Sequence, residues 1–337
     1  MAILITPRLI LRPLTADDAP AMFKNWTWDE RVSRYCRWFP HETLSQTEDL
    51  LQIYLEQAQN GFDYRWGIQL DGELIGIIDV VEQEGNTASI GYVIGHDFWN
   101  HGYMSEALSA VIEHLFSCGF SAIKAEHHID NPASGRVMEK CGMRYVGNRT
   151  TIRKFGSKET CILKCYRINA IGLKRHTLAL VPYRPCWPIL AKKEISRLKA
   201  ALGSAAISIE HVGSTAIGHI MSKPIIDIAV CSTDIPLAKE RLLTAGAVCH
   251  GEEVKDEIFF TVGEEDIRNF HIHLCRYDSQ VWQNYLNFRD YLMAYPDKAV
   301  EYEAYKIRAA KKFDRASYTA NKTSLVTRLL QEAAQWR

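Results

Sequence analysis

Several features that would direct a chain to a membrane, to nucleic acid or to an oxidising compartment are missing here. No apolar run approaches a membrane span, and the N-terminal residues form no signal-peptide pattern. The 40 Lys and Arg residues balance the 40 Asp and Glu residues, so we expect no stable nucleic-acid partner and no membrane binding. The nine cysteines include no C-x-x-C pair, which is typical of reduced thiols, so we expect a cytoplasmic protein.

The length and the 47% hydrophobic content indicate two globular domains. The pattern of strands and helices lapses around Ile171-Gly172, and we place the domains at 1–170 and 177–337. Pro182, Pro185 and Pro188 follow, and we expect them to prevent a helix there. A homodimer is compatible with the sequence.

Hydrophobic periodicity predicts an α/β (α+β) fold in both halves. In the first half, Asp71-Gly72 joins two expected strands as a hairpin, and the apolar stripe from Met104 to Phe116 has helical spacing. The expected strands of the first half lie near 9–14, 66–70, 74–81, 86–94, 123–130, 145–149 and 159–168. Those of the second half lie near 207–211, 225–230, 258–262 and 270–275. Expected helices there cover 191–202, a segment through 243, and long segments from about 281 and 299.

The most informative stretch runs from Ile90 to Ala107, which we interpret as a strand, a turn and a helix. Unpaired amides at a helix start, with the macrodipole, favour phosphate or pyrophosphate. Gly102 stands alone there, so neither the G-x-G-x-x-G dinucleotide pattern nor the Walker lysine pattern is present. An ordinary strand-turn-helix with no ligand remains the alternative.

This stretch resembles the acyl-CoA loop of the GNAT acetyltransferase superfamily, in its RimJ/RimL-like branch. Trp99 and Met104 depart from the Q/R-x-x-G-x-G/A form of that loop, whereas Gly102 matches it. The segments 6–14, with Thr-Pro-Arg-Leu, 131–134, with Asn-Pro-Ala-Ser, and 137–143 also resemble the family. The resemblance covers residues 1 to about 168. It implies a mixed, splayed β-sheet flanked by helices, and acetyl-CoA as the donor in a direct transfer to an amine.

The resemblance also implies which residues contact the donor. Backbone amides of the loop would hold the pyrophosphate, and backbone groups of the preceding strand would pair with the pantetheine arm. These residues are His101, Gly102, Tyr103, Met104, Ser105, Tyr92, Val93 and Ile94. Asn131 would cap a helix and also contact the pantetheine.

The transfer needs an acid for the departing thiolate and a base for the amine. Met138 occupies the position of the family's usual tyrosine acid. The resemblance to the RimJ/RimL-like branch implies that the serine of its N-x-x-S segment, here Ser134, is the substitute, unless Ser134 only supports the helix start. The base is open among Glu126, His128 and Asp79, with a water chain as the alternative. Period two places Glu126 and His128 on one strand face, together with Asp130.

The acceptor is a protein N-terminus or a small-molecule amine. A polycationic acceptor would need an acidic cleft. The acids in the region that shapes this cleft in the family are Glu30, Glu42, Glu48, Asp49 and Glu56.

In the second half, a Gly-Ser turn at Gly213-Ser214 is followed by the carboxylate of Asp227, a pattern typical of nucleotidyltransferase sites. The region from about 178 onward resembles the GrpB family of the nucleotidyltransferase-like fold. Segments 271–274, 288–292 and 318–322 also resemble it. The expected ligand residues are His211, Gly213, Ser214, Lys223, Asp227 and His273.

Ala229 replaces the second carboxylate of a D-x-D pair, so Asp227 would hold Mg²⁺ only weakly. The second domain is therefore a module for a nucleotide or phosphate, an active nucleotidyltransferase, or a structural appendage. A basic run is a solvated helix face or, if it faces Ser214 and Lys223, one wall of an anion pocket. The run comprises Lys306, Arg308, Lys311, Lys312 and Arg315. For the whole chain, the alternative to an acetyltransferase is a non-catalytic protein that binds or senses CoA and a nucleotide.

Overall fold

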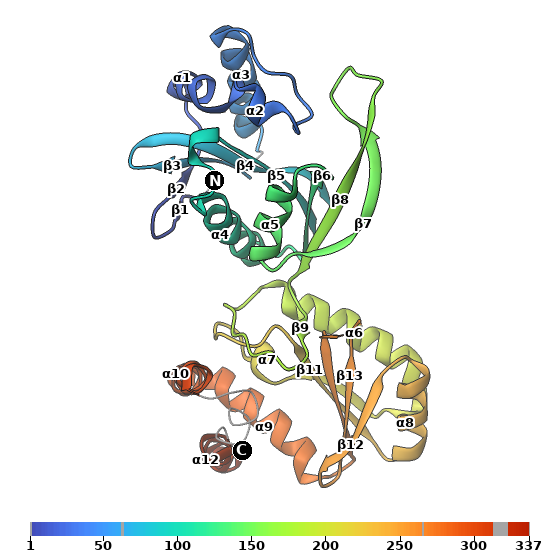
Figure 1. Ribbon diagram of the computed structural model, residues 1–337. Helices are drawn as coiled ribbons and strands as arrows, with labels where there is room; N and C mark the ends of the chain where they lie inside the picture. The colour runs from blue at the N-terminus through green and yellow to red at the C-terminus, as the bar shows by residue number, and fades with distance from the viewer. Residues whose placement is uncertain (1, 62–63, 265, 313–322, 337) are drawn as a thin grey trace. The chain divides into compact units, whose positions relative to one another are not determined.

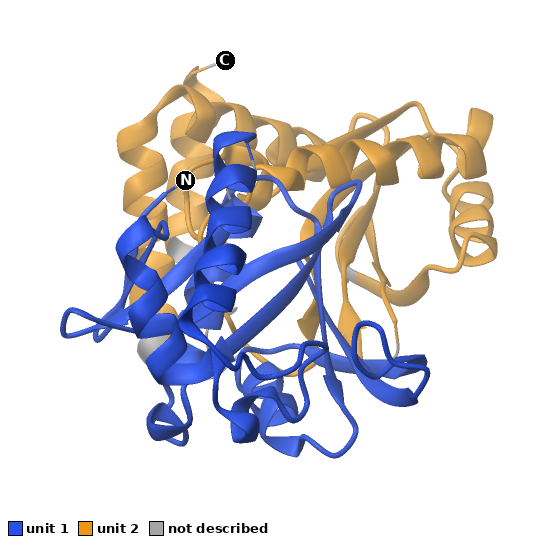
Figure 2. Ribbon diagram, turned by 90° about the horizontal axis from the view of Figure 1, so that it is seen from above, with its two compact units in different colours: residues 1–169 blue, residues 170–337 orange. Residues whose placement is uncertain are grey.

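The computed structural model describes all residues except 1, 62–63, 265, 313–322 and 337. The chain forms two compact units, Met1–Asn169 and Ala170–Arg337 (Figures 1 and 2). No helix in the described part of the chain has the length and apolar character needed to cross a membrane.

The first unit is built on an eight-stranded sheet in the order β1-β2-β3-β4-β5-β6-β8-β7. Its strands are β1 (Leu4–Ile5), β2 (Ile10–Arg12), β3 (Arg65–Leu70), β4 (Glu73–Glu84), β5 (Thr87–Ile94), β6 (Ala122–His128), β7 (Arg144–Ile152) and β8 (Thr160–Asn169). All neighbours are antiparallel except β5 and β6, which are parallel. The expected hairpin at Asp71-Gly72 is confirmed, because both residues have positive φ, as its tight turn requires.

Helices cover both faces of this sheet (Figure 1). The first group comprises α1 (Ala19–Met22), α2 (Glu30–Ser33) and α3 (Leu44–Gln59), with a 3₁₀ turn at Ala16–Asp18 and a π turn at Phe23–Thr27. A core cluster joins Met22, Trp26 and Leu51 of this group to Ile77 of β4. The other group comprises a 3₁₀ turn at His96–Phe98, α4 (Tyr103–Ser117) and α5 (Pro132–Lys140). The apolar stripe predicted from Met104 to Phe116 is the buried face of α4.

The second unit has a five-stranded sheet in the order β10-β11-β15-β13-β12, with β11 and β15 parallel. Its strands are β10 (Ser208–Val212), β11 (Ile226–Ser232), β12 (Val248–Val254), β13 (Glu257–Val262) and β15 (Phe270–Arg276). A separate pair joins β9 (Leu173–Lys174) to β14 (Ile267–Arg268). The helices are α6 (Cys186–Leu202), α7 (Ser214–Ile217), α8 (Ile235–Thr244), α9 (Gln280–Ala294), α10 (Pro296–Lys312) and α12 (Thr323–Trp336), with a 3₁₀ turn at Gly203–Ala205.

The predicted fold class is confirmed for both units, and two local expectations were wrong. Helix α6 begins at Cys186, so Pro188 lies inside its first turn, where the missing N–H would have had no helical partner in any case. Strand β12 was not expected, because Cys249-His250-Gly251-Glu252 gives no apolar alternation. The segment 318–322 and Arg315, named in the sequence analysis, lie outside the described residues, as do the side chains of Lys311 and Lys312.

Candidate functional site

The central feature of the first unit is the separation of its two parallel strands. The pairing of β5 with β6 ends at Ile90 and Ala125. Beyond that point β5 stays paired with β4 as far as Ile94, and β6 stays paired with β8 as far as His128. The two strands therefore splay from Gly91 onward, and three residues named from the sequence, Tyr92, Val93 and Ile94, lie on the splayed part of β5.

The start of α4 follows this splay. Gly102 has φ of +82°, and the first helical bond runs from the Glu106 amide to the Gly102 carbonyl. In the part of the chain that the structure describes, the amides of residues 101–105 donate no hydrogen bond. Four of these residues are at least partly exposed, and Met104 is buried. The arrangement leaves a positive helix end with unpaired donors, which suits an anion.

The N-terminal segment fixes this helix end. Glu106 accepts hydrogen bonds from the Thr6 hydroxyl at 2.6 Å and from the Arg8 amide at 2.9 Å, and it pairs with the Arg8 guanidinium. Burial alone would raise the pKa of Glu106, but the bonds from Thr6 and Arg8 hold it below its usual range. Arg8 also donates to the His101 carbonyl at 3.0 Å and lies 4.6 Å from the centre of the Tyr103 ring. A fixed cation thus lies beside the unpaired amides.

Two predicted residues are in contact on the face of the sheet that α5 covers. The hydroxyl oxygens of Tyr92 on β5 and Ser134 on α5 are 2.9 Å apart, and Tyr92 also donates to the Ser134 carbonyl at 3.0 Å. Asn131 is the N-cap of α5, as expected, and its side chain accepts from the Ser134 amide. Burial raises the pKa of Tyr92, so this phenol keeps its proton near neutral pH. The structure therefore brings together three residues named from the sequence, and the contact of the Tyr92 hydroxyl with Ser134 is one that the sequence did not indicate.

Glu126 and His128 have partners that limit their use as bases. Glu126 forms an ion pair with Arg149, whose hydrogen bonds lower the pKa of Glu126, opposite to the direction that a base for an amine requires. The Nδ1 atom of His128 accepts from the Asp130 amide at 3.1 Å, so its lone pair is already used and the proton of the neutral ring lies on Nε2.

Asp79 lies on the opposite face of the sheet from Tyr92. It pairs with Gly91 in the β4–β5 register, and a Cβ on Gly91 would lie 3.4 Å from Asp79 Oδ1. Arg65 donates to Asp79 Oδ2 at 2.9 Å. Burial outweighs this pair and raises the pKa of Asp79. The carboxylate with a raised pKa thus lies beside the first residue of the splayed part of β5.

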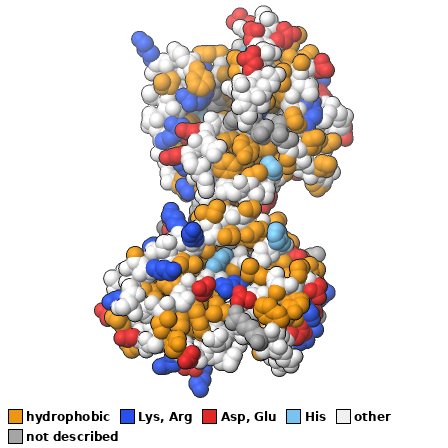
Figure 3. All heavy atoms as spheres, turned by 180° about the vertical axis from the view of Figure 1, so that it is seen from behind, with side chains coloured by type: hydrophobic (Ala, Val, Ile, Leu, Met, Phe, Trp, Pro, Cys, Tyr) orange, Lys and Arg blue, Asp and Glu red, His pale blue; other side chains and the backbone are white. Residues whose placement is uncertain are grey.

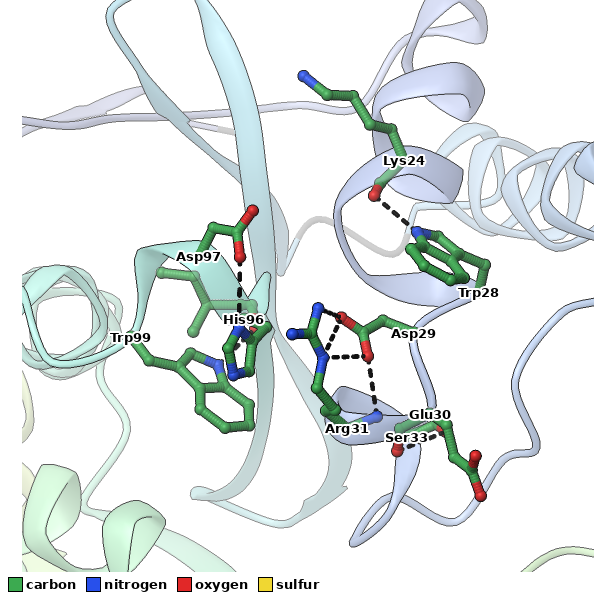
Figure 4. Close-up of polar contacts among 10 residues, drawn as sticks. Lys24, Trp28, Asp29, Glu30, Arg31, Ser33, His96, Asp97 and Trp99 are labelled. Atoms are coloured by element: carbon green, nitrogen blue, oxygen red, sulfur yellow. Dashed lines mark hydrogen bonds and ion pairs between the residues drawn. The ribbon is translucent and has the colours of Figure 1, made fainter.

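A second group of residues, of which the sequence analysis noted only Trp99, lies between α2 and the turn after β5 (Figure 4). Asp29 caps α2 and is held by Arg31 at 2.6 Å, and the hydrogen bonds from Arg31 lower the pKa of Asp29. The rings of His96 and Trp99 lie 4.7 Å apart, and the Trp99 indole donates to the Ile94 carbonyl at 3.0 Å. The Asp-Glu-Arg run at an N-cap was the one sequence signal for Asp29.

The acids expected to shape an acceptor cleft are all exposed. Figure 3 shows acidic side chains gathered around α3, where Glu48, Asp49 and Glu56 are exposed. Glu30 on α2 and Glu42 before α3 are also exposed.

The second unit contains a cavity of about 150 Å³ at the N-terminal end of β11. Its lining comprises Leu180, Ser214, Thr215, Lys223, Ile225, Asp227, His271 and Lys306. Three of the residues predicted for a ligand, Ser214, Lys223 and Asp227, therefore share one cavity with Lys306 from the basic run. Arg308, the next residue of the run, is exposed.

The carboxylate of Asp227 is surrounded by imidazoles rather than by further acids. Its Oδ1 atom lies 3.1 Å from His271 Nδ1 and 3.6 Å from His273 Nε2. His273 Nδ1 lies 2.7 Å from Glu257, and the Tyr285 hydroxyl donates to the same carboxylate at 3.1 Å. Burial alone would lower the pKa of His273, but its bonds to Asp227 and Glu257 raise it to about 9. His273 is therefore an imidazolium between two carboxylates.

The remaining predicted residues of this unit adjoin the same carboxylate. A Cβ on Gly213 would lie 2.4 Å from Asp227 Oδ2, so only glycine fits there, and its φ is +70°. His211 Nε2 lies 3.0 Å from the Thr215 hydroxyl, and burial lowers the pKa of His211 to about 4. His211 is thus neutral at physiological pH.

These contacts do not fit the magnesium ion that the sequence pattern allowed at Asp227. Mg²⁺ prefers an octahedron of oxygen ligands, usually including carboxylates. Among the described residues, no group of three or more His, Cys, Asp or Glu side chains is arranged to hold a metal ion. The strand positions that would offer further carboxylates carry Ala229, His271 and His273.

Comparison with known proteins separates the same two halves. The profile of the family described as "Acetyltransferase (GNAT) domain" matches residues 8–144, and that of "GrpB protein" matches residues 177–332. The chain is similar to "Uncharacterized N-acetyltransferase YoaA" of Bacillus subtilis, with 38% identity over 150 residues, 43% of this chain and 84% of that protein. It is similar to "Glutamate-rich protein GrpB" of Alkalihalophilus pseudofirmus, with 35% identity over 173 residues, 48% of this chain and 99% of that protein.

One relative matches across both units. "UPF0157 protein YqkA" of Bacillus subtilis is 23% identical over 294 residues, which is 85% of this chain and 82% of that protein.

Proposed function

The chain belongs to the GNAT acetyltransferases through its first unit and to the GrpB proteins through its second, and we propose that it transfers an acetyl group from acetyl-CoA directly to an amine. GNAT domains use acetyl-CoA as the donor. The observation that carries the proposal is the splay of β5 from β6 beyond Ile90, directly before a helix start with unpaired amides.

The proposed donor site uses backbone groups for binding. Amides of residues 101–105 hold the pyrophosphate, with Arg8 beside them, and the splayed part of β5 pairs with the pantetheine arm. Because Trp99 and Met104 depart from the family's loop, the binding depends on these amides rather than on loop side chains. Backbone N–H groups at the splay polarise the thioester carbonyl.

The reaction then requires two proton transfers. The amine nitrogen attacks the thioester carbon, the tetrahedral oxyanion collapses, and the carbon–sulfur bond breaks to release the CoA thiolate. We assign the proton for the thiolate to the Ser134 hydroxyl, which Tyr92 can resupply across the 2.9 Å contact. We assign the proton of the attacking amine to Asp79, through water, because it lies beside Gly91 and its pKa is raised.

The acceptor in this proposal is a cationic amine, either a protein N-terminus or a small molecule. Asp29 offsets the positive charge of Arg31 near the turn after β5, and the exposed rings of Trp28 and Trp99 offer apolar contact surface beside it (Figure 4). A second unit that holds a phosphate or nucleotide ligand completes the proposal. The cavity with Lys223 and Lys306 supports this part.

A thiol-release assay tests the enzyme proposal. The full chain is incubated with acetyl-CoA and a panel of amines and short peptides, and free CoA is measured over time. Acceleration by at least one acceptor is expected. If acetyl-CoA binds and no acceptor accelerates release, the alternative of a CoA-binding or sensing protein is favoured instead.

A further inference from the structure

The cavity of the second unit presents two lysines, and the contacts of Lys306 fix that side chain in place. Lys306 is 2% exposed, donates to the Met221 carbonyl at 2.5 Å, and lies 4.7 Å from the centre of the Tyr302 ring. A buried ammonium is costly unless compensating groups surround it. Together with Lys223, it gives the wall of the cavity a positive charge that favours an anionic ligand.

The carboxylate in the same cavity offers little to a metal ion. Oδ1 of Asp227 faces two imidazoles, at 3.1 and 3.6 Å, and Oδ2 is packed against the backbone of Gly213. A divalent cation would have to displace at least one histidine and would still find a single carboxylate. The imidazoles therefore occupy the side from which a metal ion would neutralise Asp227.

His271 uses only one of its two ring nitrogens in hydrogen bonds within the described residues. Its Nδ1–H donates to Asp227, which fixes the ring orientation, and Phe259 lies edge-on at 5.0 Å. Its Nε2 atom is buried and has no hydrogen-bond partner within the described residues. Because buried polar atoms are normally paired, this atom indicates a ligand group that completes the site.

The size of the cavity limits what enters it. About 150 Å³ is smaller than the roughly 300–1,000 Å³ of pockets that enclose a whole small ligand. A phosphoryl or pyrophosphoryl group fits this size, and the remainder of a nucleotide would lie outside.

We propose that this cavity is a metal-independent phosphoryl site, in which the histidines at Asp227 replace the metal ion of a nucleotidyltransferase-like site. The phosphoryl oxygens contact Lys223 and the Lys306 side of the wall, and they accept a hydrogen bond from Nε2–H of His271 when both ring nitrogens of that residue carry a proton. This inference rests on the proposed phosphate or nucleotide ligand of the second unit and specifies how it is bound.

Calorimetric titration with inorganic pyrophosphate tests the inference. The full chain is first saturated with CoA, so that the helix start in the first unit does not contribute, and the titration is run in EDTA and again with Mg²⁺. We expect binding in EDTA that Mg²⁺ does not tighten. Binding that appears only with Mg²⁺ overturns the inference but leaves the phosphate ligand intact. No binding under either condition overturns both.

Variants give an independent result. Lys223→Met should weaken pyrophosphate binding by about 10-fold or more, as expected for a lost charge-assisted contact, whereas the exposed Lys193→Met should not. Asp227→Asn removes a negative charge, so binding in EDTA should stay equal or become tighter. If Mg²⁺ tightens binding in the unmodified chain and this tightening is lost in a folded Asp227→Asn protein, the carboxylate is a metal ligand and the inference is overturned. If this variant does not fold, as circular dichroism would show, the Lys223 and Lys193 pair still decides the result.

Discussion

The hydroxyl oxygen of Tyr92 lies 2.9 Å from that of Ser134, and 42 residues separate them in the chain. The pair joins the splayed part of β5 to the first turn of α5. Tyr92 has one proton and two acceptors within reach, the Ser134 carbonyl and the Ser134 hydroxyl. In the proposed mechanism, a shift of this proton between them would let Ser134 release its own proton to the thiolate and recover one from Tyr92.

Replacement of Ser134 by Ala should lower kcat by about 100-fold or more, the usual effect of losing a general acid, with little change in acetyl-CoA affinity. Steady-state kinetics and calorimetry with acetyl-CoA measure the two quantities. Tyr92→Phe keeps the ring and should cost less than Ser134→Ala, and the double variant should be less than additive. An equal loss of turnover and of acetyl-CoA binding would assign Ser134 to donor binding.

Replacement of Gly102 by Ala should weaken acetyl-CoA binding by about 10-fold, because a left-handed residue at φ +82° sets the direction of the amides that follow it. Gly119→Ala is the matched control, since Gly119 follows the other end of α4 at φ +94° with no atom within 4 Å of its Cβ position. Both variants should lose about 1–2 kcal/mol of stability. Equal acetyl-CoA affinities in the two variants would contradict the role of the helix start.

The second unit should lose stability at alkaline pH. The pKa of His273 is raised from 6.5 to about 9, so its contribution is complete below pH 6.5 and is lost as pH rises through 9. The expected loss between these values is on the order of 3 kcal/mol. Thermal unfolding of the full chain across this range, compared with His273→Asn, measures it. The exposed His219→Asn is the control, and a pH dependence that survives in His273→Asn would contradict the assignment.

Replacement of Asp29 by Asn should raise KM for a cationic acceptor about fivefold, or about 1 kcal/mol, without changing KM for acetyl-CoA. Asn caps a helix as well as Asp does, so α2 should persist. Asp49→Asn removes a charge from the exposed side of α3 and should have little effect. If both variants raise KM equally, the acceptor responds to the net charge of this surface and not to Asp29.

Local patterns predicted much of the fold. The hairpin at Asp71-Gly72, the buried stripe of α4 and the Asn131 cap each depend on neighbours within about one or two turns, so the sequence contains their causes. Strand β12 has no such pattern and forms because β13 pairs with it.

The site was less predictable, because its decisive contacts join distant segments. Glu126 fits a base by type, and its ion pair with Arg149 depends on the register of β6, β8 and β7. Likewise, Asp227 and His271 become neighbours through the parallel pairing of β11 with β15. The sequence indicates which residue types could take part in the site, and the strand register determines which of them lie close together.

The bonds that Glu106 accepts from Thr6 and Arg8 have a consequence for the entropy of the proposed donor binding. Because they hold the start of α4 in one position, the amides there need not be ordered when a pyrophosphate arrives. The conformational entropy of that segment is lost on folding and not on association, so it offsets less of the free energy of donor binding. Removing the bonds from Thr6 and Arg8 to Glu106 should therefore slow binding of the donor without changing the contacts that the bound donor makes.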